Sequence, residues 1–283
     1  RLQPSEIAAM TQPLSTFTVP LPELKTAQLT HGRLTYRETG EGKKRQNLLF
    51  LHGLLGNAKS WSYQFQDRSL GQNYRLMAWD APGFGGSDLV EAHIDAYLAA
   101  LAEFVDHVAE GPIFLVGHSM GGTLAARYAA RYPEQVRRLV LSCTHPGYAE
   151  PETAPMSEKF ENRMREFAEL GAPAYGMRRA RDLLPESCPP ETLALAAEVA
   201  SEVRPEGLRR ATRMLQLADN RPLLPSLSMP TLILTGASDR VVQPRLQADL
   251  LALTPHERHI NMPGLGHGPY FQAPEYYNGL IAD

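Results

Sequence analysis

Gly117-His118-Ser119-Met120-Gly121 is the stretch that decides how this chain folds. An apolar run at 113–116 precedes it, and the length of that run favours a buried strand over a helix. An alanine-rich segment at 122–132 follows it and predicts a helix that stops before Pro133. A G-x-S-x-G pattern between a strand and a helix is the context of a nucleophile elbow, so the sequence predicts a sharp turn that presents a reactive serine.

The predicted elbow gives Ser119 the position of a nucleophile. The middle residue of such a turn is forced into a strained backbone conformation. Neighbouring chain passes too close for side chains at the flanking positions, Gly117 and Gly121. The turn lifts the serine hydroxyl clear of the sheet, and the N-terminus of the following helix favours negative charge. The alternative is a glycine-flanked turn that holds a serine by chance.

Length, charge and composition exclude several classes of protein. The 283 residues suffice for one large α/β domain with an inserted subdomain. A net charge of −3 predicts no nucleic-acid partner and no attraction to an anionic membrane. No apolar run approaches the ~18 residues of a spanning helix, so we expect a soluble protein without a membrane span.

Cysteine usage and the first residues bear on the compartment. Cys143 and Cys188 make neither a disulfide framework nor a metal cluster, which favours a reducing, cytoplasmic environment. Residues 1–26 read as a proline-bearing N-terminal arm that lacks the compact apolar core of a signal peptide. Because the chain opens on Arg1, earlier removal of a signal peptide stays open.

Strand and helix patterns alternate along most of the chain. Strands are predicted at 28–31, 34–38, 48–51, 74–79, 113–116, 136–142, 231–235 and 258–260, the first two forming a hairpin that turns at Gly32. Helices are predicted at 60–66, 93–110, 122–132 and 245–253, and from Pro274 onward. Such alternation predicts an α/β fold with a mostly parallel sheet flanked by helices.

The composition shifts between residues 144 and 225. This interval is rich in Arg, Glu and Ala, and it contains no strand-like run. Its helical patterns, broken by prolines, lie at 157–170, 173–182, 191–201 and 205–219. We therefore predict an inserted α-helical cap at 144–225 and a core made of 27–143 and 226–283. As an insertion between two strands of the sheet, the cap should control which substrates enter and take no part in the chemistry.

A nucleophilic serine needs a base, which is itself oriented by an acid. In doubly wound sheets the functional loops lie at the carboxyl ends of the strands, so partners should fall directly after strands. Asp239 follows the strand at 231–235, and His267 follows the strand at 258–260 through a short loop. The other acid position, after the strand at 136–142, holds Cys143-Thr144, which favours Asp239.

Asp239 and His267 each have an alternative role, and other histidines of the chain compete with His267 for the role of base. Asp239 is also suited to an Asx-type turn and His267 to a solvent-facing loop. Among the competitors, His256 and His259 flank or lie within a strand, where one should pack and the other face solvent. The remaining competitors are on hairpin or helix faces before the elbow, or near the cap boundary, where a structural role is favoured: His31, His93, His107 and His145.

The loop after the strand at 48–51 reads His52-Gly53-Leu54. A tetrahedral oxyanion needs two preorganised N–H donors about 3 Å away. We expect one to be the backbone N–H of Met120, directly after the nucleophile, and the other that of Leu54, where Gly53 allows close approach of the backbone. Taken alone, His52-Gly53 fits an ordinary turn at a strand end.

Together these motifs resemble the α/β-hydrolase fold superfamily over residues 28–283. They occur in the family's order: His-Gly-Leu-Leu-Gly at 52–56, Asp-Ala-Pro-Gly-Phe-Gly-Gly-Ser at 80–87, Gly-His-Ser-Met-Gly-Gly at 117–122, Asp239, and Gly266-His267. The chain is most similar to the small, capped, cofactor-free branch of carboxylesterases and C–C-bond hydrolases. The resemblance implies a pocket between cap and sheet with Ser119 at its floor, and a structural role for the turn at 80–87.

Two features of the sequence make particular subfamilies of this fold less suitable. Ser119 differs from the aspartate nucleophile of the related haloalkane dehalogenases and epoxide hydrolases. Gly268-Pro269-Tyr270 replaces the tryptophan that usually follows the catalytic histidine of the meta-cleavage C–C hydrolases, which puts that subfamily in doubt. The expected activity is hydrolysis of a carboxylic ester through an acyl-enzyme intermediate. The same triad would serve a C–C-bond hydrolase, thioesterase, lactonase or acyltransferase, and some proteins of this fold are ligand receptors with little turnover.

The sequence also predicts what the chain binds. We expect a small-molecule substrate, no metal and no cofactor, because no cluster of His, Cys, Asp and Glu has ligand spacing and no phosphate-binding glycine motif is present. We expect a monomer or a homodimer. No motif in the sequence identifies the substrate. Cap arginines could bind a substrate carboxylate or form a solvated helix face, and cap methionines such as Met164 could line the pocket or pack on the core.

Overall fold

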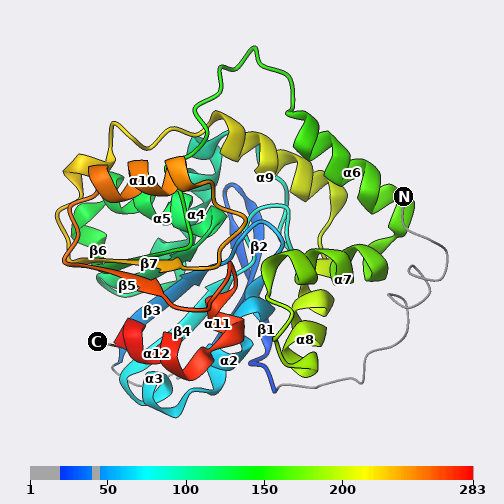
Figure 1. The fold of residues 1–283 in the computed structure, drawn as a ribbon. Coiled ribbons are helices and arrows are strands. Elements are labelled where there is room, and N and C mark those ends of the chain that lie inside the picture. Colours follow the sequence, from blue (N-terminus) through cyan, green and yellow to red (C-terminus); the bar gives the residue numbers. More distant parts are fainter. Residues whose placement is uncertain (1–19, 40–44, 283) are drawn as a thin grey trace.

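The computed structural model describes residues 20–39 and 45–282. Over these residues the chain forms one eight-stranded sheet with helices on both faces (Figure 1). The strands are β1 Leu24–Leu29, β2 Gly32–Glu38, β3 Gln46–Leu51, β4 Tyr74–Trp79, β5 Ile113–His118, β6 Val136–Ser142, β7 Thr231–Gly236 and β8 Arg258–Met262. Their order is β1-β2-β4-β3-β5-β6-β7-β8, and all pairs from β4 to β8 are parallel. The predicted mostly parallel sheet is confirmed.

The N-terminal hairpin differs from the prediction at its turn. The antiparallel register pairs Leu29 with Gly32, so the chain reverses at Thr30-His31 and not at Gly32. Gly32 opens the second strand with φ at +115°, which a residue with a Cβ would rarely adopt. The hairpin also begins at Leu24, inside the arm expected for residues 1–26. The rest of that arm, residues 1–19, lies outside the described residues.

Helices of the core cover both faces of the sheet. They are α2 Ser62–Gln66, α3 Arg68–Asn73, α4 Ile94–Val108, α5 Met120–Arg131, α10 Pro244–Leu253, α11 Pro269–Gln272 and α12 Pro274–Ala282, with a 3₁₀ turn at Ala58–Trp61. Two of them, α3 and α11, were not predicted, because six and four residues are too few to show a helical period. Asp67 starts α3 by accepting a hydrogen bond from the Leu70 N–H at 2.8 Å.

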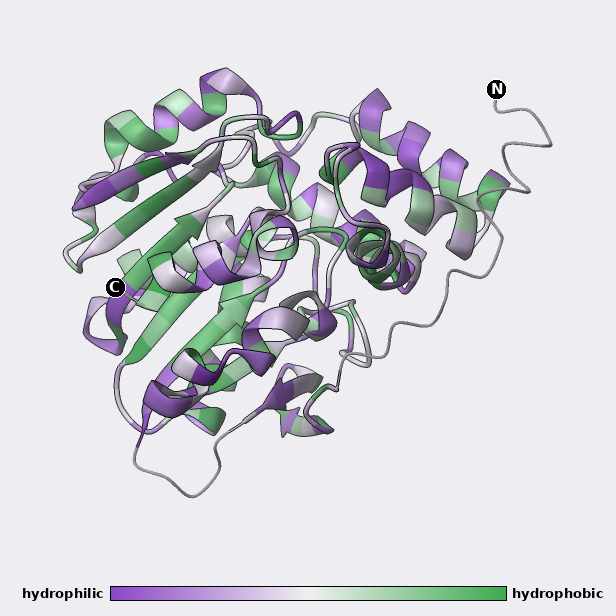
Figure 2. Cartoon of the chain, turned by 60° about the horizontal axis from the view of Figure 1, so that its bottom comes forward, coloured by the Kyte–Doolittle hydropathy of each residue, from purple (hydrophilic) through white to green (hydrophobic). Residues whose placement is uncertain are grey.

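Alternate residues of each central strand enter different apolar layers. In β3, Leu49 and Leu51 belong to the cluster under α4 and α5, whereas Leu48 and Phe50 belong to the cluster under α2 and α12. Both layers exclude water, since these four residues are at most 1% exposed. Figure 2 shows the result, with hydrophobic strands between helices whose outer faces are hydrophilic. A strand buried on both faces explains the continuous apolar runs in the sequence.

Between β6 and β7 the chain forms α6 Glu158–Leu170, α7 Ala172–Leu183, α8 Pro190–Ser201 and α9 Pro205–Leu217. These match the four helical patterns predicted for the interval, and no described residue of the interval is in a strand. The four helices gather at one end of the sheet, to which β5 and β6 also point (Figure 1). None of the described helices is long and apolar enough to cross a membrane.

Candidate active site

The turn between β5 and α5 has the predicted strained geometry. Ser119 has φ 53° and ψ −116°, in a region that residues with a Cβ seldom occupy. A Cβ on Gly117 would lie 2.4 Å from the carbonyl oxygen of Gly121, and one on Gly121 would lie 2.2 Å from that of Leu51. Thr144, directly after β6, donates its hydroxyl to the Ser119 carbonyl at 2.6 Å. Close packing on several sides therefore holds the strained residue in place.

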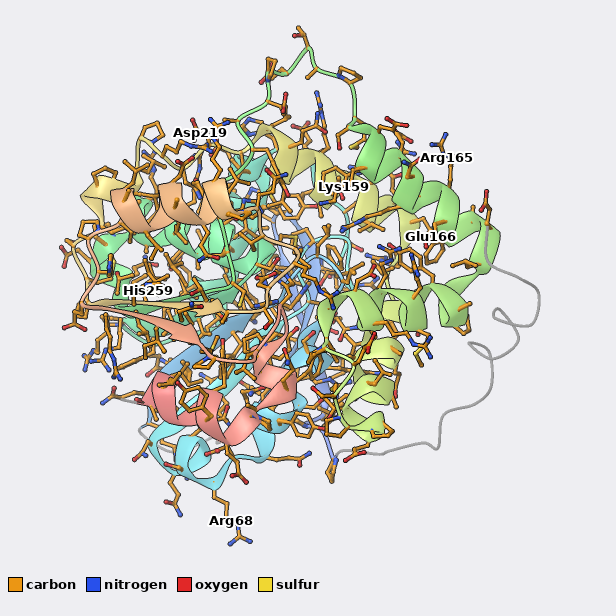
Figure 3. All side chains as sticks on the ribbon, in the orientation of Figure 1. Arg68, Lys159, Arg165, Glu166, Asp219 and His259 are labelled. Atoms are coloured by element: carbon orange, nitrogen blue, oxygen red, sulfur yellow. The ribbon has the colours of Figure 1, made fainter. Side chains whose placement is uncertain are left out.

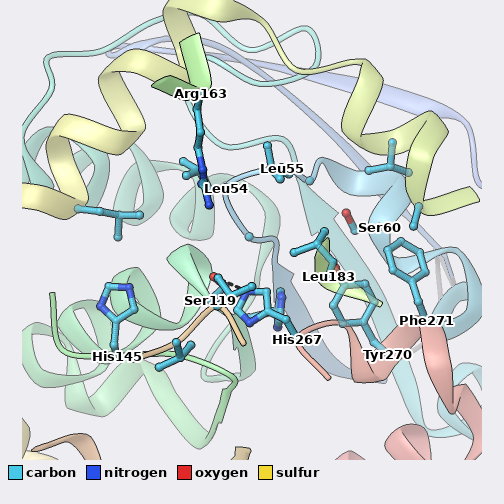
Figure 4. A pocket seen from close by; sticks show the side chains of 18 of the residues that line it. Leu54, Leu55, Ser60, Ser119, His145, Arg163, Leu183, His267, Tyr270 and Phe271 are labelled. Atoms are coloured by element: carbon cyan, nitrogen blue, oxygen red, sulfur yellow. Dashed lines mark hydrogen bonds between the residues drawn. The ribbon is translucent and has the colours of Figure 1, made fainter. Parts of the chain in front are cut away.

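Three side chains from distant parts of the chain form a hydrogen-bonded series at the carboxyl end of the sheet. The Nε2 of His267 lies 3.0 Å from the Oγ of Ser119 (Figure 4), and its Nδ1 lies 2.9 Å from an oxygen of Asp239. His267 is 4% exposed. The structure therefore brings together the three residues that the sequence predicted as nucleophile, base and acid.

Asp239 is held as a carboxylate. Burial raises its pKa, but the hydrogen bond and charge of His267 and the N–H groups of Val241 and Val242 lower it by more, so its pKa is below the ordinary value. An ionised carboxylate can only accept, so the Nδ1 of His267 carries the proton. That tautomer leaves the Nε2 lone pair facing Ser119, ready to take the hydroxyl proton.

Two backbone N–H groups beside Ser119 have no acceptor among the described residues. They belong to Leu54 and Met120, and Met120 is the first residue of α5, where helix N–H groups have no partner within the helix. The loop that carries Leu54 abuts the nucleophile, since a Cβ on Gly53 would lie 3.2 Å from the Ser119 Cβ. Both predicted oxyanion donors are thus unpaired and close to Ser119.

His52 fixes the loop that carries Leu54. Its Nδ1 lies 2.8 Å from the Gly53 carbonyl, which can only accept, so Nδ1 is the protonated nitrogen. Its Nε2 accepts the Ala81 N–H at 2.9 Å. Burial lowers the pKa of this imidazole, which favours the neutral form that both bonds require. The 3₁₀ turn at Ala58–Trp61 is also held by a buried side chain, because Asp80 accepts the Ala58 N–H at 2.7 Å.

A cavity of about 60 Å³ lies above Ser119, between the sheet and helices α6–α9 (Figure 4). That space holds about five water molecules, so the site accepts a small group beside the nucleophile. The inserted interval contributes much of its wall: His145, Tyr148, Lys159, Phe160, Arg163, Leu183, Ala196, Val199 and Leu215. Other parts of the wall come from the loop after β3 and from α11, including Leu54, Leu55, Tyr270 and Phe271.

His145 lines this cavity, although sequence reasoning favoured a structural role for it. Its Nδ1 accepts the Gly147 N–H at 3.1 Å, so the neutral ring carries its proton on Nε2. Burial, assisted by the charges of His267 and Arg221, lowers the pKa of His145 to about 4. The sequence did contain a signal for this role of His145, because it lies shortly after β6 just as Asp239 lies shortly after β7.

The other competing residues lie away from the chemistry. His256 and His259 are both exposed, so the expectation that one of them packs inside is wrong, and His259 lies on the edge strand β8 (Figure 3). The Nε2 of His259 lies 2.9 Å from the Oγ1 of Thr235, so the ring is held by a contact with β7.

Met164 packs against the core and is not among the residues that line the cavity. Within residues 20–39 and 45–282 no group of His, Cys, Asp and Glu is arranged to hold a metal.

The chain matches the sequence family described as alpha/beta hydrolase fold over residues 46–274. It is 30% identical over 266 residues to the pimeloyl-[acyl-carrier protein] methyl ester esterase of Yersinia enterocolitica, covering 89% of this chain and 96% of that relative. A thermophilic esterase from Thermogutta terrifontis has a similar structure, with a TM-score of 0.76 and 26% identity over 92% of this chain and 96% of the other. The enol-lactonase of Burkholderia xenovorans LB400 has a TM-score of 0.79 at 20% identity, covering 92% and 98%.

Proposed function

Because the chain belongs to the α/β-hydrolase fold family and its relatives are esterases, it is a carboxylic ester hydrolase, and we propose that Ser119, His267 and Asp239 are its catalytic triad. The observation that carries this proposal is the continuous series of hydrogen bonds from Asp239 through His267 to Ser119, at 2.9 and 3.0 Å. The series ends at the wall of a cavity large enough for the reacting group.

In the first half of the reaction, the Ser119 Oγ attacks the ester carbonyl while its proton moves to the Nε2 of His267. The carbonyl oxygen becomes an oxyanion, which receives hydrogen bonds from the N–H groups of Leu54 and Met120. Asp239 stabilises the imidazolium that forms. The C–O bond to the alcohol then breaks, and the alcohol departs with the proton from Nε2, leaving the acyl group on Ser119.

In the second half, water takes the place of the alcohol. His267 removes a proton from the water as its oxygen attacks the acyl carbonyl, and the same two N–H groups hold the second oxyanion. Collapse returns the proton from Nε2 to the Ser119 Oγ and releases the carboxylic acid. Every proton removed by His267 is given back within one cycle, so no cofactor is consumed.

The substrates we propose are esters with a small alcohol group, such as methyl esters. Support comes from the small space beside Ser119 and from the methyl ester esterase name of the Yersinia relative. We also propose that the protein acts in the cytoplasm as a monomer or homodimer. Light scattering on the eluting peak of a size-exclusion column would measure the oligomeric state.

Residues 144–225 form the proposed cap over a core of 27–143 and 226–283. Leu215 of α9 lines the cavity, whereas Met164 of α6 does not. Leu215→Ala should therefore change the preference for acyl chain length more than it changes turnover of p-nitrophenyl acetate, and Met164→Leu should change neither. Equal losses for long and short esters in Leu215→Ala, with stability retained, would show that the cap supplies catalytic groups.

A phosphonylating probe tests the mechanism directly. An alkyl fluorophosphonate should label one serine stoichiometrically as fluoride departs, and peptide mass spectrometry should place the label on Ser119. His267→Ala should react far more slowly, because the hydroxyl then lacks its base. If another residue is labelled and Ser119→Ala still hydrolyses esters at the wild-type rate, Ser119 is not the nucleophile.

A further inference from the structure

Arg163 occupies an unusual position in the cavity. It extends from α6 toward Ser119 and Leu54, from the side opposite the sheet (Figure 4). The guanidinium carbon lies 5.5 Å from the ring centre of Phe160, the residue one turn earlier. Among the described residues the Arg163 side chain has no hydrogen-bond acceptor and no acidic partner. A half-buried cation therefore faces the substrate space without a counter-ion.

Two other arginines of the inserted interval, Arg179 and Arg209, differ from Arg163 because they have acidic partners. Arg179 pairs with Glu166 and with Asp182, and Arg209 pairs with Glu161. Glu161 and Glu166, the acidic residues that flank Arg163 on α6, are thus already engaged. The pKa of Arg163 is lowered by burial and by the charge of Arg179, against the opposing influence of Tyr175, Tyr148 and Asp182. The protein itself supplies too little negative charge to balance this cation.

The charge of the cavity wall is one-sided. Lys159, one turn before Arg163 on the same helix, also lines the cavity, at its exposed rim. No Asp or Glu is among the described residues that line it. The remaining wall is mostly apolar, which leaves Arg163 as the position where an anionic group of a substrate would be best satisfied.

We propose that Arg163 binds a carboxylate carried by the acyl part of the substrate, so that the preferred substrates are monoesters of short dicarboxylic acids. This inference rests on the proposed function, since it orients the ester carbonyl toward Ser119. The planar guanidinium matches a carboxylate with two parallel hydrogen bonds, which a lysine cannot reproduce. Arg163 and Ser119 line the same small cavity, which favours a diacid with few carbons between its two ends.

The test compares monomethyl glutarate with methyl pentanoate, which replaces the free carboxylate by a methyl group. Wild type should show a kcat/KM about 10- to 100-fold higher for the anionic ester, the range expected for a hydrogen-bonded charge pair. In Arg163→Met this ratio should fall to about one. Arg165→Met is the matched control and should retain the ratio. Arg165 projects outward from the same helix, and its one hydrogen bond within the described part of the chain is to Asn162 (Figure 3).

Calorimetry with glutarate gives a second readout that requires no turnover. Glutarate should bind wild type and Arg165→Met alike and bind Arg163→Met at least about 10-fold more weakly, with inorganic phosphate a poorer ligand than glutarate. If Arg163→Met does not fold, Arg163→Gln takes its place in both experiments. A ratio near one in wild type, a ratio that survives in Arg163→Met, or tighter binding of phosphate than of glutarate would overturn the inference.

The two experiments separate this inference from the proposed function. Hydrolysis of methyl pentanoate through Ser119 without any preference for monomethyl glutarate would leave the esterase mechanism standing and remove the role of Arg163. If neither ester is hydrolysed, the proposed function fails for these substrates. Loss of glutarate binding in Arg163→Met would then still support the carboxylate site, and equal binding would exclude it.

Discussion

Asp239 binds His267 with one carboxylate oxygen and the backbone with the other. Its Oδ2 lies 2.9 Å from the Nδ1 of His267, and its Oδ1 accepts the Val241 N–H at 2.7 Å. The second bond fixes the rotation of the carboxylate, so the imidazole is oriented by a group that cannot itself turn away. Asp239 thus transmits the rigidity of the loop after β7 to the base.

The first prediction follows from this orientation. Asp239→Asn should lower kcat by about 10³- to 10⁴-fold, because an amide NH₂ directed at Nδ1 favours the tautomer whose Nε2 carries a proton. Asp249→Asn is the control, since Asp249 pairs with Arg221 outside the cavity and should leave kcat unchanged. Steady-state kinetics with a short p-nitrophenyl ester measures both variants. A kcat within tenfold of wild type in Asp239→Asn would remove Asp239 from the triad.

The second prediction concerns the nucleophile and base together. Ser119→Ala and His267→Ala should each reduce turnover by roughly 10⁴-fold or more, and the double variant should lose little beyond either single one, because the residues act as a unit. His259→Ala, which alters an exposed histidine, should retain activity. Circular dichroism should show intact folds. Additive losses in the double variant would mean that the two side chains act separately.

The third prediction tests the close packing at the elbow. The new Cβ in Gly121→Ala would lie 2.2 Å from the backbone oxygen of Leu51, so the free energy of unfolding should fall by about 3 kcal/mol or more. The Cβ in Gly279→Ala, within α12, meets no atom within 4 Å and should stabilise by up to about 1 kcal/mol. Urea denaturation measures both. Similar stability of the two variants would contradict the packing described here.

The fourth prediction concerns acid stability. His145 has a folded-state pKa of about 4, below the value of 6.5 expected when unfolded. Between these two values the unfolded chain binds more protons, so stability should fall as pH drops from about 6.5 to 4 and be independent of this group above that range. Its contribution is on the order of 3 kcal/mol.

The comparison of wild type with His145→Gln isolates that contribution from other titrating groups. Urea unfolding at several pH values should show wild type losing stability relative to the variant as the solution is acidified. Parallel curves from pH 7 to 4 would mean that His145 is protonated as easily in the folded as in the unfolded chain.

The fifth prediction is independence from metals. The proposed chemistry uses only side chains and backbone N–H groups, so activity should survive dialysis against EDTA within experimental error. Inactivation by EDTA that is reversed by one added divalent cation would contradict the mechanism. Inductively coupled plasma mass spectrometry on the dialysed protein checks that the metal has been removed.

The sheet and the grouping of Ser119, Asp239 and His267 could be predicted because each depends on local chemistry. Buried strands such as β4 and β6 carry apolar runs at 76–79 and 139–141, and their predicted bounds agree with the structure. Asp239 and His267 follow strands, and parallel strands place their carboxyl ends along one edge of the sheet. The short helices α3 and α11 were not predicted, because their start depends on capping and on the preceding turn and not on a periodic pattern.

The cavity wall could not be predicted in the same way. Arg163 and Arg165 are two positions apart on α6, so helical geometry places their side chains about 200° apart, and only one of them can face Ser119. Which face of α6 is turned toward the cavity depends on how the helix packs against its neighbours α7 and α9, and that is set by tertiary packing. Likewise Leu215 and Met164 are both apolar residues of cap helices, and only the first reaches the cavity.

Ser119 and His267, the proposed nucleophile and base, stand 148 positions apart along the chain. During translation the elbow leaves the ribosome long before His267 does. A nascent polypeptide that stalls anywhere between them carries a serine hydroxyl with no imidazole to take its proton. Because the proposed mechanism needs both side chains, a chain truncated anywhere before His267 should have no esterase activity.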